Sequence, residues 1–124
     1  QVRKFVEGAM EGLKFSYLNP DDTLNVFVQS VPEAGKTQRD KEITRHQIWI
    51  NTALGIVDEV IEHGLGWHKQ GKVAATVDKV KKYMGLTKEV LVKTTFSNDF
   101  VGKVNLSSDE WKRVRKGAKR YLSR

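Results

Sequence analysis

Three histidines are the side chains of this sequence best suited to metal binding or proton transfer. His63 and His68 flank a glycine-containing segment, with Glu62 next to the first of them, and His46 stands earlier in the chain. Two helical ligands share one face when four residues separate them, as in His-x-x-x-His. His63 and His68 do not have this spacing. We therefore expect no metal site, and we expect His46 at the surface or at the edge of the core.

Acid–base catalysis needs two ionisable groups that converge in a cleft. Asp58, Glu59 and Glu62 fall in one predicted helix, but their spacing is equally typical of a solvated polar face. Ser97 has no histidine close to it in sequence. The chain has no cysteine, which excludes disulfides, thiolate zinc sites and a cysteine nucleophile. We therefore expect no catalytic residue and no cofactor, and we do not expect an enzyme.

The segment Gly64-Leu65-Gly66 has two interpretations. A glycine loop before a helix N-terminus can hold a phosphate, because that end of a helix attracts anions. A phosphate loop also supplies a Lys followed by Ser or Thr, and here Lys69 and Lys72 are present without that pattern. We favour the other interpretation, in which Gly64 ends a helix and Trp67 packs as an anchor in the turn.

The elements that carry these residues are predicted from apolar residues repeating every three to four positions. This spacing predicts helices at about 2–18, 20–31, 39–63, 73–84 and 107–122. In the third helix, one stripe contains Ile43, Ile50, Leu54, Val57 and Ile61. The fold class is therefore mostly α, with about five helices and little sheet.

Local signals set the expected ends of these helices. Asn19 is expected to cap the second helix, with Pro20 at its first position. Ser107 or Ser108 opens the last helix, with acidic residues in its first turn. Thr87 is expected to cap a short apolar turn at 90–92. The remaining segment, 93–105, has weak periodicity and is expected to form loop or short strand.

Composition indicates one globular domain. The 124 residues are 39% hydrophobic and 30% charged, with no apolar run long enough to span a membrane. No apolar signal-peptide core follows Gln1. The net charge is +7, and residues 107–124 hold seven basic and two acidic side chains, which leaves +5 there and +2 elsewhere.

The basic segment 107–124 is the part of the sequence best suited to macromolecular binding. Its basic side chains suit phosphates, an anionic membrane surface or an acidic partner. Its apolar face also suits docking on the body of the protein, and we favour docking with a solvated basic face. The face consists of Trp111, Val114, Ala118, Tyr121 and Leu122. Gly117 is expected to weaken this helix by about 1 kcal/mol.

The order of several segments resembles one family, the substrate-binding proteins of ABC importers for thiamine pyrimidines, nitrate, sulfonates and taurine. The resemblance covers about residues 2–101 and lies in order and spacing rather than in one diagnostic motif. Its segments are Phe5–Phe15, Asn19-Pro20-Asp21-Asp22, Gly64-Leu65-Gly66-Trp67, Tyr83-Met84-Gly85-Leu86, and finally Phe96, Asn98 and Phe100. Residues 104–124 extend beyond the usual end of the family pattern.

The resemblance implies that residues 1–103 are the C-terminal helical portion of such a protein, followed by a basic helix at 104–124. The family fold is a two-lobed α/β periplasmic binding protein of type II, which closes on a small molecule held between its lobes. Most ligand contacts would then lie upstream of Gln1, and the ligand-binding residues stay unassigned. The implied partners are a small-molecule ligand and an ABC permease, with a possible homo-oligomer, and the implied location is periplasmic or extracytoplasmic.

The alternative hypothesis is a free-standing small helical protein that binds nucleic acid or an acidic partner through its basic C-terminal helix. The concentration of charge in residues 107–124 favours it. The nearly balanced body, and the lack of a helix-turn-helix pattern, argue against nucleic acid.

Overall fold

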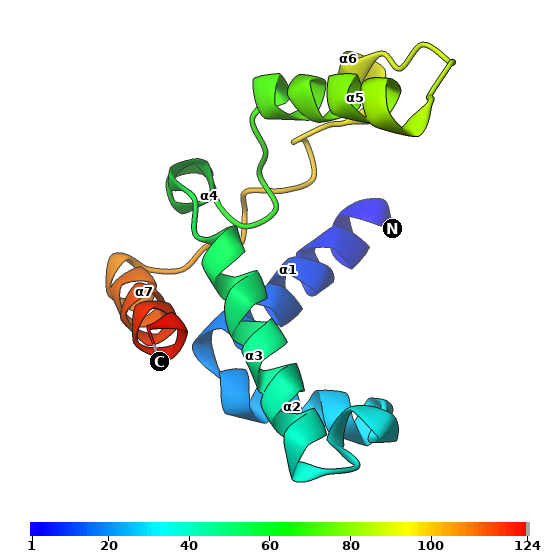
Figure 1. Cartoon of the computed structure of the whole chain (residues 1–124). Helices are drawn as coiled ribbons and strands as arrows, with labels where there is room; N and C mark the ends of the chain where they lie inside the picture. The colour runs from blue at the N-terminus through cyan, green and yellow to red at the C-terminus, as the bar shows by residue number, and fades with distance from the viewer. Residues whose placement is uncertain (124) are drawn as a thin grey trace.

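The chain folds as a set of helices joined by short connections (Figure 1). A computed structural model describes residues 1–123, without the side chains of residues 94 and 95. The long helices are α1 (Val2–Leu18), α2 (Pro20–Ser30), α3 (Gln38–Gly55), α5 (Gln70–Met84) and α7 (Ser108–Leu122). The short ones are η1 (Pro32–Gly35), α4 (Asp58–His63) and α6 (Val92–Thr95). The described residues form no strand, so the mostly helical fold class is confirmed.

The predicted helix at 39–63 is wrong in one respect, because it is two helices. α3 ends at Gly55, and Ile56 and Val57 leave the helical conformation before α4 begins (ψ 81° and 152°). Glycine is a poor helix former, and the Tyr17 hydroxyl occupies the space where a side chain at position 55 would lie. The break also directs Ile56 and Val57 toward the core.

The predicted N-terminal cap of α7 is confirmed, whereas the side chain of Asn19 does not cap α2 as predicted. Ser107 caps α7 and exchanges hydrogen bonds with Glu110 in a capping box. Thr37 and Asp40 form the same motif at α3. Asn19 does occupy the N-cap position of α2, but its side chain accepts no bond there. Its amide instead donates to the carbonyl of Phe15 at 3.2 Å, so it ends α1.

The segment after α5 differs from its predicted structure. The short helix α6 begins at Val92, with Leu91 as its N-cap residue, so Thr87 does not cap a turn there. Gly85 has the left-handed conformation (φ 68°) and ends α5, as the sequence indicated.

The hydrophobic core joins the beginning, middle and end of the chain. Tyr17 of α1 meets Trp111 of α7 edge-on, with ring centroids 6.1 Å apart. Burial raises the pKa of the Tyr17 phenol. The buried cluster consists of Tyr17, Val60, Leu65, Val104, Leu106, Trp111 and Val114. Residues 104–124 therefore share one core with residues 1–103.

Figure 1 shows α5 and α6 apart from the body formed by α1, α2, α3 and α7. Two connections, residues 64–69 and 96–107, link them to that body. An ion pair between Lys72 and Glu59 adds a link between α5 and α4, with N and O 2.7 Å apart. In the part of the chain that the structure describes, no helix has the length and apolar character needed to cross a membrane.

Candidate functional site

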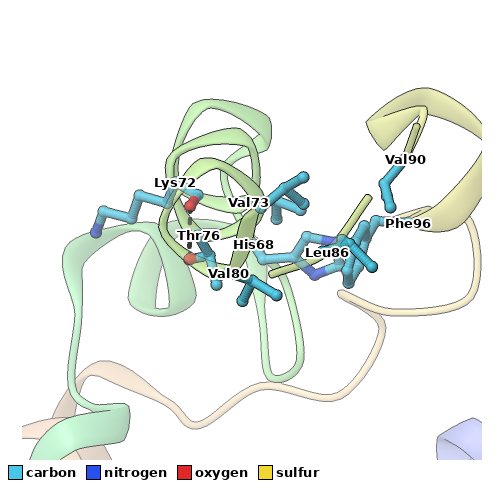
Figure 2. Close-up of a pocket in the computed structure, with 9 residues that line it drawn as sticks. His68, Lys72, Val73, Thr76, Val80, Leu86, Val90 and Phe96 are labelled. Carbon is cyan, nitrogen blue, oxygen red and sulfur yellow. Dashed lines mark hydrogen bonds between the residues drawn. The ribbon is translucent and has the colours of Figure 1, made fainter. Parts of the chain in front are cut away.

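An open apolar groove runs along α5 and is completed by the chain that follows it (Figure 2). Its volume is about 580 Å³. The lining residues are His68, Lys72, Val73, Thr76, Val77, Val80, Leu86, Val90 and Phe96. Helical spacing places Val73, Val77 and Val80 on one face of α5. The chain changes direction at Gly85, so that Leu86 and Val90 line the same groove as these valines.

The polar atoms at the groove are mostly engaged elsewhere. The Thr76 hydroxyl donates to the Lys72 carbonyl of its own helix at 2.9 Å. In Figure 2 the Lys72 side chain extends away from the other lining residues, and its ammonium pairs with Glu59. The hydrogen bond from Lys72 holds the pKa of the Glu59 carboxyl below its usual range. The groove is therefore suited to binding apolar surface, with the His68 imidazole as a polar group at one end.

The Asn98 side chain forms two hydrogen bonds with the backbone of His68, one of the residues that line the groove. Its side-chain oxygen accepts a hydrogen bond from the His68 amide at 3.2 Å, and its Nδ2 donates to the His68 carbonyl at 2.8 Å. The His68 ring meets Phe96 edge-on, with centroids 5.9 Å apart. The Phe96 and Asn98 singled out by the resemblance thus hold the two connections of α5 and α6 together. Nothing in the sequence indicated this reciprocal pair, because 30 residues separate the partners.

The glycine segment forms a closed turn rather than a phosphate cradle. Gly64 ends α4 with φ 102°, where the left-handed region favours glycine. The amide of Leu65 donates to the Val104 carbonyl at 2.8 Å, and that of Trp67 donates to Gly64 at 3.2 Å. With the His68 amide bound to Asn98, these donors are used within the protein. Of the two interpretations, the helix end and turn is confirmed.

Each histidine lies against an aromatic ring. The ring centroids are 5.6 Å apart for His46 and Tyr121, 4.2 Å for His63 and Trp67, and 5.9 Å for His68 and Phe96. The described residues contain no group of three metal-ligating side chains. Trp67 packs on His63, in agreement with its expected role as an anchor.

The three acidic residues considered for catalysis take separate partners. Asp58 pairs with Arg115 at 3.5 Å and Glu59 with Lys72 at 2.7 Å, and a Glu62 carboxylate oxygen lies 3.8 Å from Nε2 of His63. Asp58 and Glu59 line one hollow together with Lys72, whereas Glu62 does not line it.

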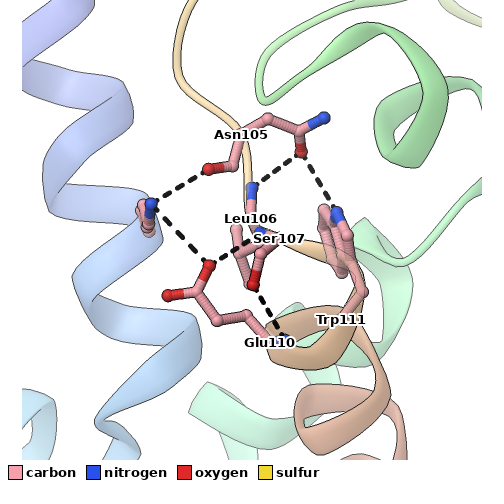
Figure 3. A network of polar contacts seen from close by, with 6 residues as sticks. Asn105, Leu106, Ser107, Glu110 and Trp111 are labelled. Atoms are coloured by element: carbon pink, nitrogen blue, oxygen red, sulfur yellow. Dashed lines mark hydrogen bonds and ion pairs between the residues drawn. The ribbon is translucent and has the colours of Figure 1, made fainter.

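A polar network holds the start of α7 against the rest of the chain (Figure 3). The side-chain oxygen of Asn105 accepts from the Trp111 indole at 3.1 Å and from the Leu106 amide at 2.8 Å. Its Nδ2 donates to the Ile61 carbonyl at 3.0 Å. Lys14 of α1 donates to the Asn105 carbonyl at 3.0 Å. This network satisfies the polar atom of a buried tryptophan, so its role is structural.

The apolar face of α7 is docked, as the sequence favoured. Trp111, Val114 and Ala118 are buried, and Tyr121 stacks on Trp49 of α3. Leu122 stays exposed.

A second apolar surface lies on α3, and here the sequence was misleading. Only the last two residues of the stripe predicted from helical spacing, Val57 and Ile61, pack against the core, and they lie beyond α3. Ile43 is 49% exposed, Ile50 37% and Leu54 73%, whereas the buried residues of α3 are Thr44 and Thr52. Phe5 of α1, at the predicted apolar face, is 78% exposed. Among the described residues, no element therefore covers these apolar side chains of α1 and α3.

Comparison with known proteins gives one informative similarity. No family profile matches the chain, and no solved structure matches it. The riboflavin-binding protein RibY of Chloroflexus aurantiacus is 28% identical over 105 residues. These cover 81% of this chain and 28% of that protein. The chain thus spans little more than a quarter of the length of the curated relative that it matches.

Proposed function

We propose that this chain is the C-terminal helical portion of the substrate-binding protein of an ABC importer. The observation that carries the proposal is the similarity to a riboflavin-binding protein, of which this chain spans 28%. The uncovered apolar faces on α1, α3 and α5 support it, because a free-standing monomer rarely leaves large contiguous apolar patches in water.

The preceding part of the same polypeptide is the proposed cover for these faces. The groove along α5 is lined mainly by valine, leucine and phenylalanine, and α3 presents Ile43, Ile50 and Leu54. Burying such side chains contributes about 25 cal/mol per Å². The polar groups beside them are already paired within the chain, so the gain is not offset by unpaired polar atoms.

The ligand of the intact protein is a small organic molecule held between two α/β lobes that close on it. Candidates are a thiamine-pyrimidine precursor, a sulfonate and, from the named relative, a flavin. The intact protein acts outside the cytoplasmic membrane, and its closed form docks on the permease. No covalent chemistry is needed for this function.

A cysteine-labelling experiment tests the proposed cover. The chain contains no cysteine, so Leu54→Cys introduces a single thiol at a position that is 73% exposed. A water-soluble maleimide should label it quickly in the 124-residue chain and slowly in the full-length gene product. Lys41→Cys is the matched control, because it is an exposed polar position of the same helix. Lys41→Cys should react quickly in both proteins.

Equal labelling of Leu54→Cys in the two proteins would contradict the proposal. Slow labelling of both variants in the full-length product would indicate that α3 is shielded on all sides rather than covered specifically at its apolar stripe. A flavin-quenching titration of the full-length product then tests riboflavin as the ligand separately from the cover.

The second candidate function is binding of nucleic acid or an acidic partner through α7. It is favoured by Arg113, Lys116, Lys119 and Arg120, which have no ion pair within the described residues. Removing α7 is not a clean test, because Trp111 and Val114 belong to the core. The double variant Lys116→Gln, Lys119→Gln keeps that core. If α7 is the binding surface, this variant should reduce DNA affinity and its salt slope.

A further inference from the structure

A second hollow lies where the start of α2, the middle of α3 and the end of α7 meet. Its volume is about 350 Å³, and it is separate from the groove along α5. This hollow is lined by charged and aromatic residues, whereas the groove along α5 is lined mainly by valines and other apolar residues. The lining residues are Asp21, Arg45, Trp49, Gly117, Arg120 and Tyr121. We refer to these six residues as the arginine cleft.

An aromatic wall forms one side of the arginine cleft. Trp49 and Tyr121 stack with their ring planes 19° apart and their centroids 5.6 Å apart. Gly117 makes this arrangement possible, because a Cβ at that position would lie 2.6 Å from the indole of Trp49. The two rings come from α3 and α7, so the docking of α7 builds the wall.

The guanidinium of Arg45 is incompletely satisfied. Its Nε is buried and has no hydrogen-bond partner among the described residues. The carboxylate of Asp21 lies 3.1 Å from this atom, within ion-pair distance but outside hydrogen-bonding geometry. The Asp21 side chain is 76% exposed, so water screens its charge. This atom is itself shielded from solvent, but the Arg45 side chain as a whole is 40% exposed, so the rest of the guanidinium is accessible to a ligand.

The charges around the cleft favour an anion. Arg120 lines it, and the described residues place no acidic side chain within 4.0 Å of that guanidinium. Arg113 lines an adjoining hollow that shares Trp49. The cleft itself therefore holds two arginines and one exposed carboxylate, and Arg113 in the adjoining hollow adds a further positive charge. This excess of positive charge favours an anionic ligand.

We propose that the arginine cleft binds the phosphate group of a small phosphate monoester. Guanidinium groups bind phosphate oxygens through charged, directional hydrogen bonds, and Arg45 and Arg120 can approach from α3 and α7. The wall of Trp49 and Tyr121 accepts a planar group attached to the phosphate. The site lies within this chain, so it does not depend on the importer function proposed above.

Phenyl phosphate is the probe, because it carries both a dianionic phosphate and a planar ring. Titration at low salt is followed through the indole N–H signals of the three tryptophans. The Trp49 signal should shift, while those of Trp67 and Trp111 should stay in place. Inorganic phosphate should bind more weakly than phenyl phosphate, and phenol should not bind measurably.

Two variants should lower the affinity for phenyl phosphate, one should raise it, and a fourth serves as the control. Arg45→Gln and Arg120→Gln should each weaken binding by about tenfold or more, as expected for loss of one charged hydrogen bond. Asp21→Asn should tighten binding, because it removes the nearby negative charge. Lys119→Gln is the matched control, since it removes an equal charge next to Arg120 and does not line the cleft.

Several results would overturn the proposal. A Trp49 signal that does not move in the folded wild-type chain would exclude the site. Equal weakening by Lys119→Gln and Arg120→Gln would assign binding to the diffuse charge of α7, as nucleic-acid binding would also do. Misfolding could explain weaker binding by a variant but not tighter binding. The tighter binding expected for Asp21→Asn is therefore a result that a misfolded protein cannot produce.

Discussion

Gly117 of α7 lies directly against the indole of Trp49 of α3, with room for a hydrogen but not for a methyl group. A Cβ at position 117 would lie 2.6 Å from one ring carbon and 2.9 Å from another. The sequence suggested only that Gly117 weakens its helix. The structure shows that this residue sets the distance at which the basic helix docks, and thereby forms one side of the arginine cleft.

The first prediction concerns this contact. An extra methyl group forced into a packed site usually costs about 1–3 kcal/mol, and the higher helix propensity of alanine offsets about 1 kcal/mol of this. Gly117→Ala should therefore lower the free energy of unfolding by up to about 2 kcal/mol. Urea denaturation, followed by circular dichroism, measures the difference.

The control for this prediction is Gly12→Ala in α1. A Cβ at position 12 meets nothing within 4 Å, so only helix propensity changes. This variant should stabilise the protein by about 0.5–1 kcal/mol. If Gly117→Ala is stabilising by a similar amount, α7 does not pack on Trp49 as described.

The second prediction concerns Asn105 and the buried indole of Trp111. Asn105→Ala removes the acceptor of the Trp111 N–H and the donor to the Ile61 carbonyl. The residue Trp111 is 3% exposed, so water does not readily replace the bond. We expect a loss of about 1–3 kcal/mol in unfolding free energy. Asn51→Ala, at an exposed position of α3, should change it by less than about 0.5 kcal/mol.

The third prediction concerns stability in acid. The Ser107 backbone amide donates to Glu110 and holds the pKa of its carboxyl below the ordinary value of 4.5. A lowered pKa in the folded state stabilises the protein above the unfolded value, and this stability is lost as pH falls through the folded pKa. Unfolding free energy should therefore decrease below about pH 4.5. Glu110→Gln should have a shallower decrease, and an unchanged acid slope in that variant would contradict the assignment.

The fourth prediction concerns the link between Asn98 and His68. Asn98→Ala removes both hydrogen bonds that join the two connections of α5 and α6. Hydrogen exchange of the His68 amide should become faster, because its acceptor is gone, while amides in α7 should keep their protection. Faster exchange across α7 as well would show that the link supports the whole core rather than this region.

Much of the helical structure was predictable from the sequence, because its signals are local. Pro20, Gly64, Gly85 and the Ser107–Glu110 pair set helix ends through contacts within a few residues. The break after Gly55 was missed, and the Tyr17 hydroxyl that occupies the space beside this glycine comes from another helix, which local sequence signals do not reveal.

The candidate sites were less predictable. Periodicity identified an apolar stripe on α3 but not whether this chain covers it, and Ile50 and Leu54 proved exposed. The arginine cleft was missed because it joins three helices. Its one sequence signal was the basic character of α7, which does not reveal that Arg120 lines the same hollow as Arg45 and Trp49.

The account rests most on the claim that this chain is part of a larger substrate-binding protein. The intact mass of the natural gene product tests this most directly. We expect a product roughly three times the 14.1 kDa of this chain, since 81% of the chain matches 28% of its relative. A natural product of 14.1 kDa would contradict it and would leave α7 and the arginine cleft as the functional surfaces.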